Sequence, residues 1–180
     1  MSASSPFSSF YDLTNVLENG ADLRIAPGAG EREQIAAWLE IESLDGLKAV
    51  IKLTRSGSGR YVYRAHFDAD VVQASVVSLE PVPSHLTADF ERSYQLAPKP
   101  SRPGRKRNAA PVVALNPDDE DAPELLDSPV IDIAAPVLEE LALALDPYPR
   151  KEGESFAPPP ESAESAPNNP FAILKSLKGS

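Results

Sequence analysis

The chain has 180 residues, a length that suits one ordinary domain and argues against two domains with well-filled cores. It contains no cysteine, which excludes disulfides, thiolate metal sites and cysteine nucleophiles and predicts a cytoplasmic protein. The opening residues 1–7 lack the charged and apolar regions of a secretory signal, and no apolar run is long enough for a membrane helix. We therefore expect a soluble protein with no membrane partner.

The formal net charge of −10 is divided unevenly along the chain. Residues 1–97 carry 8 basic and 13 acidic side chains, and residues 98–111 carry 5 basic and no acidic ones. Residues 112–149 then carry 10 acidic and no basic side chains, whereas residues 150–180 carry 4 of each. An evenly acidic protein would repel nucleic acid, but this segregation predicts separate basic and acidic binding segments.

Short alternating runs separated by a turn signal predict a β-hairpin near the start of the chain. Apolar and polar residues alternate within 7–16 and again within 21–26, and the frequent turn dipeptide Asn19-Gly20 lies between them. Within residues 31–42 the apolar side chains recur at steps of three and four after two early acids, which predicts an amphipathic helix.

The two-residue period of β-strands follows this helix. Alternating residues within 47–54 and 60–71 form apolar faces, and the Ser/Gly turn at 56–59 joins the two runs into a long hairpin. The alternation resumes within 85–95 after a turn rich in proline. Together these elements predict an α+β fold, an antiparallel β-meander with one or two packed helices and a disordered C-terminal tail, whose β-rich core domain spans residues 1–97.

Proline and charge change the character of the chain after this domain. Most of the nineteen prolines follow residue 97, and residues 98–128 are predicted to form a disordered charged linker. Residues 151–180 are predicted to form a disordered tail that ends in a short amphipathic motif.

Between these two segments, residues 129–150 are predicted to form a strand and a helix that dock on the core domain. Residues 130–133 read as a short extended piece. Residues 134–145 read as an apolar helix, and Pro136 is compatible with that helix only in its first turn.

No arrangement of side chains in the sequence predicts catalysis, a cofactor or a resident metal. The Gly-x-Ser-x-Gly, P-loop and His-Glu-x-x-His patterns are all absent, so we expect a protein that is not an enzyme. His66, Asp68 and Asp70 share one strand face and could offer three ligands to a divalent metal, and a hydrolase or nuclease would have to use them. The preferred interpretation is a solvated outer strand face.

Gly28-Ala-Gly30 before the predicted helix faintly resembles a phosphate cradle, because helix N-termini bind anions. The charges of Glu31 and Glu33 lie in the same turn and would oppose a phosphate. A loop that sets up the helix is therefore the preferred interpretation.

The candidate binding sites are the charged segments and the C-terminal motif. The candidate RNA-binding residues are Lys99, Arg102, Arg105, Lys106 and Arg107. The candidate partner-binding residues are Asp118, Asp119, Glu120, Asp121, Phe171, Leu174 and Leu177. The basic residues could contact RNA phosphate, or they could form a solvated linker that meets the acidic segment, and both interpretations stay open. The apolar stripe of the motif could dock on its own domain or in a partner's groove.

Five segments, spread in order over nearly the whole chain, carry a resemblance to a known family. They are residues 31–32, 72–82, 131–133, 139–150 and 169–174. In these segments the chain resembles the YceD family, in its alphaproteobacterial form, whose members are associated with accumulation of large-subunit ribosomal RNA in bacteria. Many relatives have a Cys-x-x-Cys where this chain has Ser75 and Ser78, and hydroxyl groups cannot replace thiolates on zinc.

The resemblance implies a non-catalytic ribosome-biogenesis factor that supports the synthesis, processing or accumulation of 23S ribosomal RNA. Its expected partners are ribosomal RNA or a basic ribosomal protein of the large subunit, bound by a monomer through the segments of opposite charge. The alternative is a protein-interaction adaptor unrelated to ribosomes, which would recruit its partner through the C-terminal motif.

Overall fold

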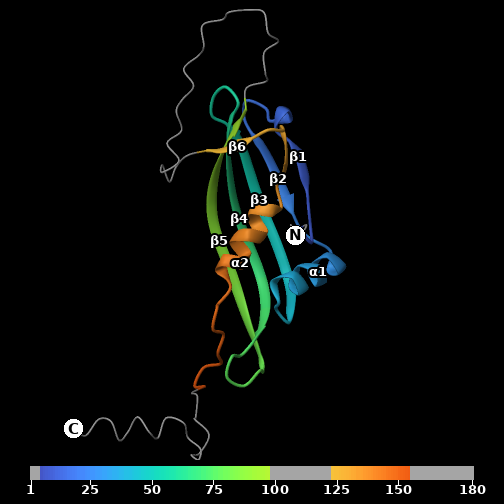
Figure 1. Ribbon diagram of the computed structural model, residues 1–180, viewed down its shortest axis with the longest axis vertical. Helices are drawn as coiled ribbons and strands as arrows, with labels where there is room; N and C mark the ends of the chain where they lie inside the picture. Colours follow the sequence, from blue (N-terminus) through green and yellow to red (C-terminus); the bar gives the residue numbers. More distant parts are fainter. Residues whose placement is uncertain (1–4, 98–122, 155–180) are drawn as a thin grey trace, which may run out of the picture. The chain divides into compact units, whose positions relative to one another are not determined.

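The computed structural model describes residues 5–97 and 123–154 (Figure 1). The chain divides into two compact units, Met1–Arg150 and Lys151–Ser180, and the fold described below belongs to the first. Its main sheet contains the strands β2 (Ala21–Ile25), β3 (Ser43–Arg55), β4 (Arg60–Ala74), β5 (Pro81–Leu96) and β6 (Glu124–Leu126), in that order across the sheet. The remaining elements are β1 (Phe10–Asp12), the 3₁₀-helix η1 (Leu13–Asn15), α1 (Ala29–Leu39), β7 (Val130–Asp132) and α2 (Ala135–Ala144).

Strands β2 to β5 are antiparallel and consecutive along the chain, and β6 pairs with β5 in parallel. With its two helices and mostly antiparallel sheet, the structure confirms the predicted α+β class. The strand β6 was not predicted, because the sequence analysis placed its three residues inside a linker. The boundaries drawn at residues 98 and 129 stay predictions, and the tail predicted to be disordered lies mainly outside the described residues.

The alternation of apolar and polar residues explains the long strands. On β4 the inward side chains are all buried, and they are Tyr61, Tyr63, Ala65, Phe67, Ala69 and Val71. This is the apolar face predicted from the sequence. The predicted turn after β3 is also present: Ser56 N donates to Arg60 O, and Gly57 and Gly59 adopt positive φ angles of 126° and 72° that suit glycine. Strand β3 begins four residues earlier than predicted and contains a register shift between Leu44 and Gly46.

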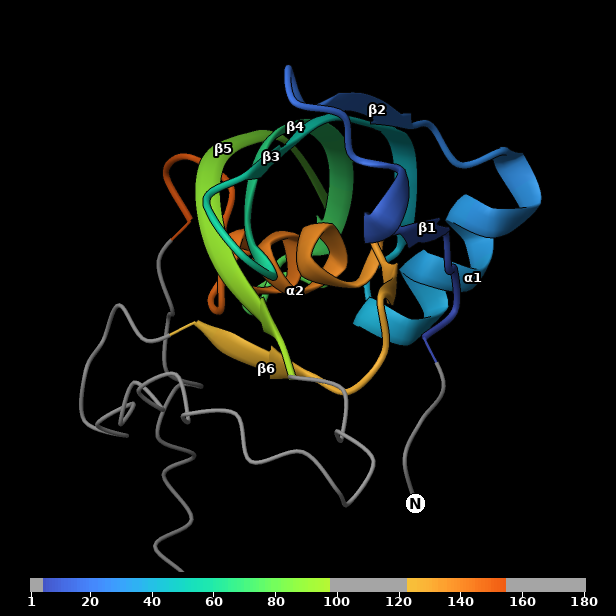
Figure 2. The ribbon, with the colours of Figure 1, turned by 90° about the horizontal axis from the view of Figure 1, so that it is seen from above.

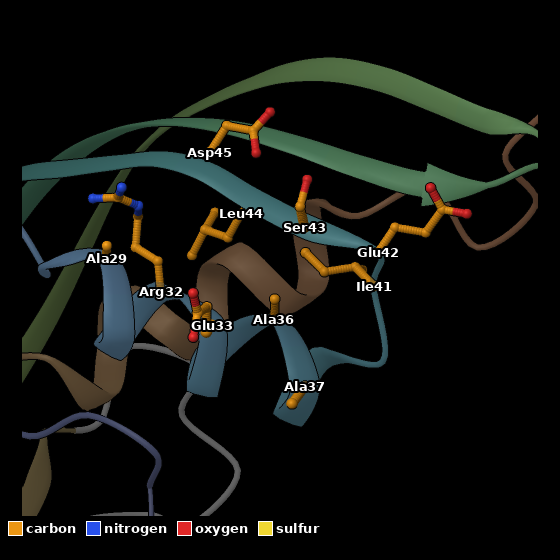
Figure 3. Close-up of a pocket in the computed structure, with 10 residues that line it drawn as sticks. All are labelled: Ala29, Arg32, Glu33, Ala36, Ala37, Ile41, Glu42, Ser43, Leu44 and Asp45. Atoms are coloured by element: carbon orange, nitrogen blue, oxygen red, sulfur yellow. The ribbon is translucent and has the colours of Figure 1, made fainter.

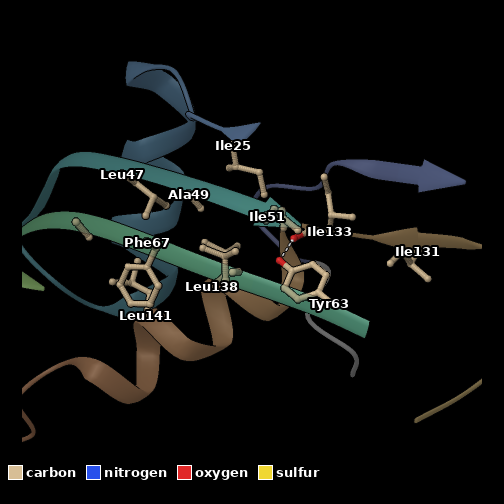
Figure 4. Packing of buried hydrophobic residues seen from close by; sticks show 14 of the residues in the cluster. Ile25, Leu47, Ala49, Ile51, Tyr63, Phe67, Ile131, Ile133, Leu138 and Leu141 are labelled. Atoms are coloured by element: carbon tan, nitrogen blue, oxygen red, sulfur yellow. Dashed lines mark hydrogen bonds between the residues drawn. The ribbon is translucent and has the colours of Figure 1, made fainter. Parts of the chain in front are cut away.

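Helix α2 supplies the buried side chains that pack against the inward face of the sheet. Seen along the strands, the sheet curls around α2, which lies on its concave side (Figure 2). Val137, Leu138 and Leu141 of the helix are almost fully buried, and the side chains of Leu138 and Leu141 lie over the inward face of β4 (Figure 4). The predicted extended piece and helix are therefore both present, and Pro136 lies in the first turn of the helix as expected.

Two polar contacts fasten α2 and its preceding residues to the sheet. The hydroxyl of Tyr63 is buried and donates to the Ile133 carbonyl at 2.8 Å, the bond drawn in Figure 4. Arg92 of β5 forms ion pairs with Glu139 Oε2 at 2.9 Å and Glu140 Oε1 at 3.2 Å. Partial burial would by itself lower the pKa of Arg92, but Glu139 and then Glu140 outweigh this effect and raise it.

Helix α1 begins two residues before the predicted helix and ends three residues before its predicted end. At its start the Glu31 carboxylate accepts a hydrogen bond from the Gly28 N–H at 2.6 Å. At its end Glu40 adopts a left-handed conformation with φ of 57°, and the Ile41 N–H donates to the Ala36 carbonyl. This left-handed residue ends the helix at Leu39. The apolar period of the sequence continues to Ile41, but Ile41 lies beyond the helix.

The hairpin predicted from residues 7–16 and 21–26 is wrong. The turn itself exists, since Gly20 N donates to Leu17 O at 3.0 Å, but the segments on its two sides pair elsewhere. Strand β1 pairs with β7, and β2 pairs with β3. Strand β2 pairs with β3 because β3 is a long strand with an edge available beside it. Strand β1 pairs with β7 because the adjoining residue Leu13 of η1 is buried and donates its N–H to the Pro129 carbonyl, next to β7.

Burial of two tyrosines predicts a loss of stability at alkaline pH. Tyr94 lies edge-on to Tyr63, with ring centres 6.3 Å apart, and burial raises the pKa of both, that of Tyr94 to about 12 from an ordinary 10.0. Because the unfolded chain releases these protons first, the contribution to stability is complete below pH 10 and is lost as the pH rises from there through the folded pKa. Chemical denaturation between pH 8 and 12 should show this fall, and Tyr94→Phe should make it shallower. An equal slope in the variant would contradict the assignment to Tyr94.

Candidate partner-binding surface

All residues predicted as binding sites lie outside the described residues. They are Lys99, Arg102, Arg105, Lys106 and Arg107, the acidic Asp118, Asp119, Glu120 and Asp121, and the apolar Phe171, Leu174 and Leu177. These assignments stay predictions, and the surfaces described below come from β4, β5 and the residues around α2.

The outward side of β4 and β5 carries a network of histidine and aspartate side chains. His66 Nδ1 lies 3.0 Å from Asp89 Oδ1, and its Nε2 lies 3.4 Å from Asp68 Oδ2. His85 Nδ1 lies 2.8 Å from Asp70 Oδ1, and its Nε2 lies 3.9 Å from Asp68 Oδ1. The described residues contain no group of three or more His, Cys, Asp or Glu side chains that could hold a metal ion. The exposure of all five side chains agrees with a solvated outer strand face.

Four carboxylates of this surface, Asp68, Asp70, Asp89 and Glu91, lie on β4 and β5, and we call them the acidic face. Basic side chains accompany them on the β3 side of this surface: Lys48 and Lys52 of β3 pair in register with Asp68 and Arg64, and Arg64 Nε lies 2.6 Å from Glu91 Oε2. An open hollow of about 450 Å³ lies over part of this surface, and it is lined by Val50, Lys52, Arg64, Ala65, His66, Asp89, Phe90 and Glu91. Because the lysines lie on β3 and the carboxylates on β4 and β5, the β5 side of this surface favours a cationic partner over a polyanion.

Two segments far apart in the sequence meet beyond the end of β4. The Val76 N–H donates to the Pro149 carbonyl at 2.9 Å, and the Gln73 amide donates to the Asp146 carbonyl at 2.9 Å. Both segments carry exposed apolar side chains: Val76 and Leu79 of the turn are 49% and 77% exposed, and Tyr148 of the other segment is 69% exposed. The turn after β4 and the residues after α2 therefore form one connected surface with apolar character.

A buried serine shapes the turn in this surface. The Ser75 side chain is fully buried, and its Oγ accepts hydrogen bonds from the N–H groups of Val77 and Ser78 at 3.1 and 3.3 Å. The Leu79 N–H donates to the Ser75 carbonyl, and Leu79 itself adopts a positive φ of 61°. Hydroxyl bonding to nearby backbone N–H groups is a common way to hold a tight turn.

A second cavity lies between α1 and β3. Its volume is about 480 Å³, and it is lined by Ala29, Arg32, Glu33, Ala36, Ala37, Ile41, Glu42, Ser43, Leu44 and Asp45 (Figure 3). The guanidinium of Arg32 donates to the Pro27 carbonyl at 3.0 Å, and the Gly28 N–H is already bonded to Glu31. With three acidic residues in the lining and this amide occupied, the start of α1 offers no cradle for a phosphate, in agreement with the preferred interpretation of the Gly-Ala-Gly loop.

Most of the described site lies in a part of the chain that matches a known protein family. Residues 63–178, nearly two thirds of the sequence, match the model of the family described as "Large ribosomal RNA subunit accumulation protein YceD". The chain belongs to the YceD family. No curated protein and no solved structure matches the chain.

The YceD match starts at Tyr63, near the beginning of β4, and includes β5, β6, β7 and α2. It therefore contains the acidic face, the surface beyond the end of β4, and every binding residue predicted from the sequence. Strands β2 and β3 and helix α1 precede the match, as do residues 31–32, which contributed to the resemblance seen in the sequence.

The structure gives a role to Ser75, one of the two serines at the positions that the resemblance compared with a Cys-x-x-Cys. Because the Oγ of Ser75 accepts two backbone N–H groups, this position holds the turn through hydrogen bonds and needs no metal or disulfide to do so. The two serines were noted in the sequence, but these hydrogen bonds were not predicted. One sequence signal for this turn was available: two serines three residues apart, followed by Pro81 and Pro83.

The contacts of Arg92 with Glu139 and Glu140 were not predicted from the sequence either. An arginine at an inward position of a strand, among apolar neighbours, was a signal that it meets an acidic partner across the core. In the described part of the chain, neither helix is long and apolar enough to cross a membrane.

Proposed function

We propose that this YceD protein is a non-catalytic, monomeric, cytoplasmic ribosome-biogenesis factor that supports accumulation of 23S ribosomal RNA by holding a basic protein of the large subunit. The family description places its members in the accumulation of large-subunit ribosomal RNA. The observation that carries the finer proposal is the acidic face on β4 and β5, which lies inside the matched residues.

Charge complementarity is the physical support for a basic partner. Ribosomal proteins must neutralise RNA phosphates and are therefore rich in Lys and Arg, and a surface of exposed carboxylates attracts such a protein before it reaches the RNA. The acidic residues 118–121 would extend this attraction, and the basic residues between Lys99 and Arg107 would contact the RNA itself. The proposed function is non-catalytic because the family description refers to accumulation of an RNA and names no chemical reaction.

The proposal is tested by reversing the charge of the acidic face. Asp68→Lys/Asp89→Lys changes two exposed carboxylates, and we expect the variant to lose co-sedimentation with large-subunit precursors. Expressed in cells that lack the natural protein, the variant should fail to restore the ratio of 23S to 16S ribosomal RNA that the natural protein restores. Raised salt should weaken co-sedimentation of the natural protein, because exposed charges are screened.

The matched control is Glu18→Lys/Glu33→Lys, which makes the same change of charge on exposed residues away from the acidic face. This control should co-sediment like the natural protein. Equal behaviour of the two double variants would remove the acidic face from the proposal. Normal 23S ribosomal RNA in cells without the protein would instead favour an adaptor unrelated to ribosomes.

A further inference from the structure

Strand β5 is paired along the whole of one edge and along very little of the other. Strand β4 pairs with it from Ala74↔Pro81 to Arg60↔Gln95 with no register shift. On the opposite edge, β6 pairs only with the last three residues, Tyr94 to Leu96. Figure 1 shows β5 at the side of the sheet, with β6 crossing near one end. In the described part of the chain, the rest of this edge has no strand beside it.

The direction of the backbone groups along this edge follows from two hydrogen bonds. The Leu96 N–H donates to the Gly59 carbonyl, on the β4 side, and the Ala97 N–H donates to the Leu126 carbonyl, on the β6 side. Because the bonding direction alternates from residue to residue along a strand, the odd-numbered residues of β5 direct their N–H and C=O groups away from β4. These residues are His85, Thr87, Asp89, Glu91 and Ser93.

The start of β5 lacks donors on this edge. Pro81 and Pro83 are also odd-numbered, and proline has no N–H, so neither can bond to a neighbouring strand there. The edge that can accept a strand therefore runs from His85 to Ser93, roughly 27 Å at the usual rise of a strand.

The inward side of this edge is apolar and incompletely covered. Leu86, Ala88 and Phe90 of β5 are only partly buried. Their partners on β4, which are Ala69, Phe67 and Ala65 in that order, are almost fully buried. The difference arises because β4 has strands on both sides and β5 does not. A strand added at the edge would cover these side chains with its own apolar residues.

The outward side of the same stretch is the acidic face. A neighbouring strand would place its outward side chains beside Asp89 and Glu91, with Asp68 and Asp70 one strand further in. Lys or Arg at those positions would be attracted, and Asp or Glu would be repelled.

We propose that the open edge of β5 binds an extended basic segment of a partner protein, in which apolar residues alternate with Lys or Arg, as an added strand of the sheet. The inference rests on the proposed function, since it specifies how a basic partner is held. Main-chain hydrogen bonds supply affinity in this mode, and the alternating side chains supply selectivity.

Hydrogen exchange on the full chain gives the most direct test, with a nine-residue peptide of alternating Val and Lys as the probe. In the free protein the amides of Ala88 and Phe90 should exchange slowly, because they point to β4, and those of Thr87, Asp89 and Glu91 should exchange quickly. Adding the peptide should slow the three odd-numbered amides selectively. A peptide of alternating Val and Glu, and a Val/Lys peptide with alternate backbone nitrogens methylated, should leave them unchanged.

A matched pair of variants at one residue separates the backbone from the side chain. Thr87→Pro removes an edge N–H and should weaken binding of the Val/Lys peptide by at least about tenfold, whereas Thr87→Ala keeps the N–H and should bind like the natural protein. Asp89→Lys/Glu91→Lys leaves the backbone intact and should also weaken binding, so the inference stays testable if Thr87→Pro fails to fold.

Equal binding of the Val/Glu peptide would overturn the inference, and so would the absence of protection at the odd-numbered amides when the Val/Lys peptide is added. Protection that appears without peptide and depends on protein concentration would also overturn it, because a second copy of the chain would then occupy the edge. The test is separable from that of the proposed function. If Thr87→Pro loses the peptide but co-sediments normally with large-subunit precursors, the edge inference fails and the function stands. If the natural protein binds the peptide but does not co-sediment, the function fails.

Discussion

Replacing Leu141 with alanine is expected to lower the free energy of unfolding by about 2–5 kcal/mol, the range for removing a buried leucine from a packed core. Leu141 is fully buried where α2 meets the inward side chains of β4, next to Phe67 (Figure 4). The substitution removes apolar contacts and leaves a space that the curled sheet can close only in part. Urea denaturation followed by circular dichroism would measure the change in midpoint.

Leu143 provides the control on the same helix. Its side chain is 76% exposed, so Leu143→Ala makes the same chemical change without opening a cavity. The expected effect is within about 0.5 kcal/mol. If the two variants were equally stable, α2 would not pack on the sheet in the way described.

Replacing Gly20 with alanine is expected to destabilise the protein by about 1–3 kcal/mol through backbone strain, and a steric clash would add to this loss. Gly20 has a φ of 92°, a conformation that residues with a side chain rarely adopt, and a Cβ there would lie 2.8 Å from the backbone oxygen of Leu53. Because Leu53 belongs to β3, the backbone cannot move aside without disturbing the β2–β3 pairing. Thermal unfolding would record the loss.

Gly30 is the matched glycine. It lies in α1 without a positive φ, and a Cβ at this position would meet no atom within 4 Å. Gly30→Ala is therefore expected to stabilise the protein by up to about 1 kcal/mol, because alanine restricts the unfolded chain. Opposite signs for the two glycines are the expected result, and a loss of stability in both would contradict the geometry given for α1.

The sequence was most informative where structure is local and repetitive. The two-residue period of Tyr61, Tyr63 and Phe67 identified β4 and its buried face, and the period of α2 together with Pro136 identified that helix. Both patterns extend over ten residues or more, and each needs only near neighbours to be recognised. The α+β class followed from them.

Long-range pairing could not be predicted in the same way. Strands β1 and β7 have three residues each, and Tyr11 pairs with Ile131 across almost the whole described chain. The turn at Asn19-Gly20 is real, but a turn signal does not state which strands it separates. The local sequence pattern predicted a hairpin, but β2 pairs with the longer strand β3 along its whole length.

The candidate sites show a similar division. Charge segregation drew attention to residues 98–121, and the structure adds a surface that no run of charges marks, because Asp68 and Asp89 lie on different strands. The one sequence signal for the open edge was the pair Pro81 and Pro83, since prolines two apart at the start of a strand are compatible only with an edge.

The place of α2 in the chain has a consequence for synthesis of the protein on the ribosome. Strands β2 to β5 are complete by Leu96, but the helix that covers their concave side does not begin until Ala135. While the intervening residues are being translated, Tyr63 and Phe67 face water or a chaperone, and the nascent sheet is prone to aggregation. Synthesis of α2, and not completion of the strands, is thus the step that allows the concave side of the sheet to be covered.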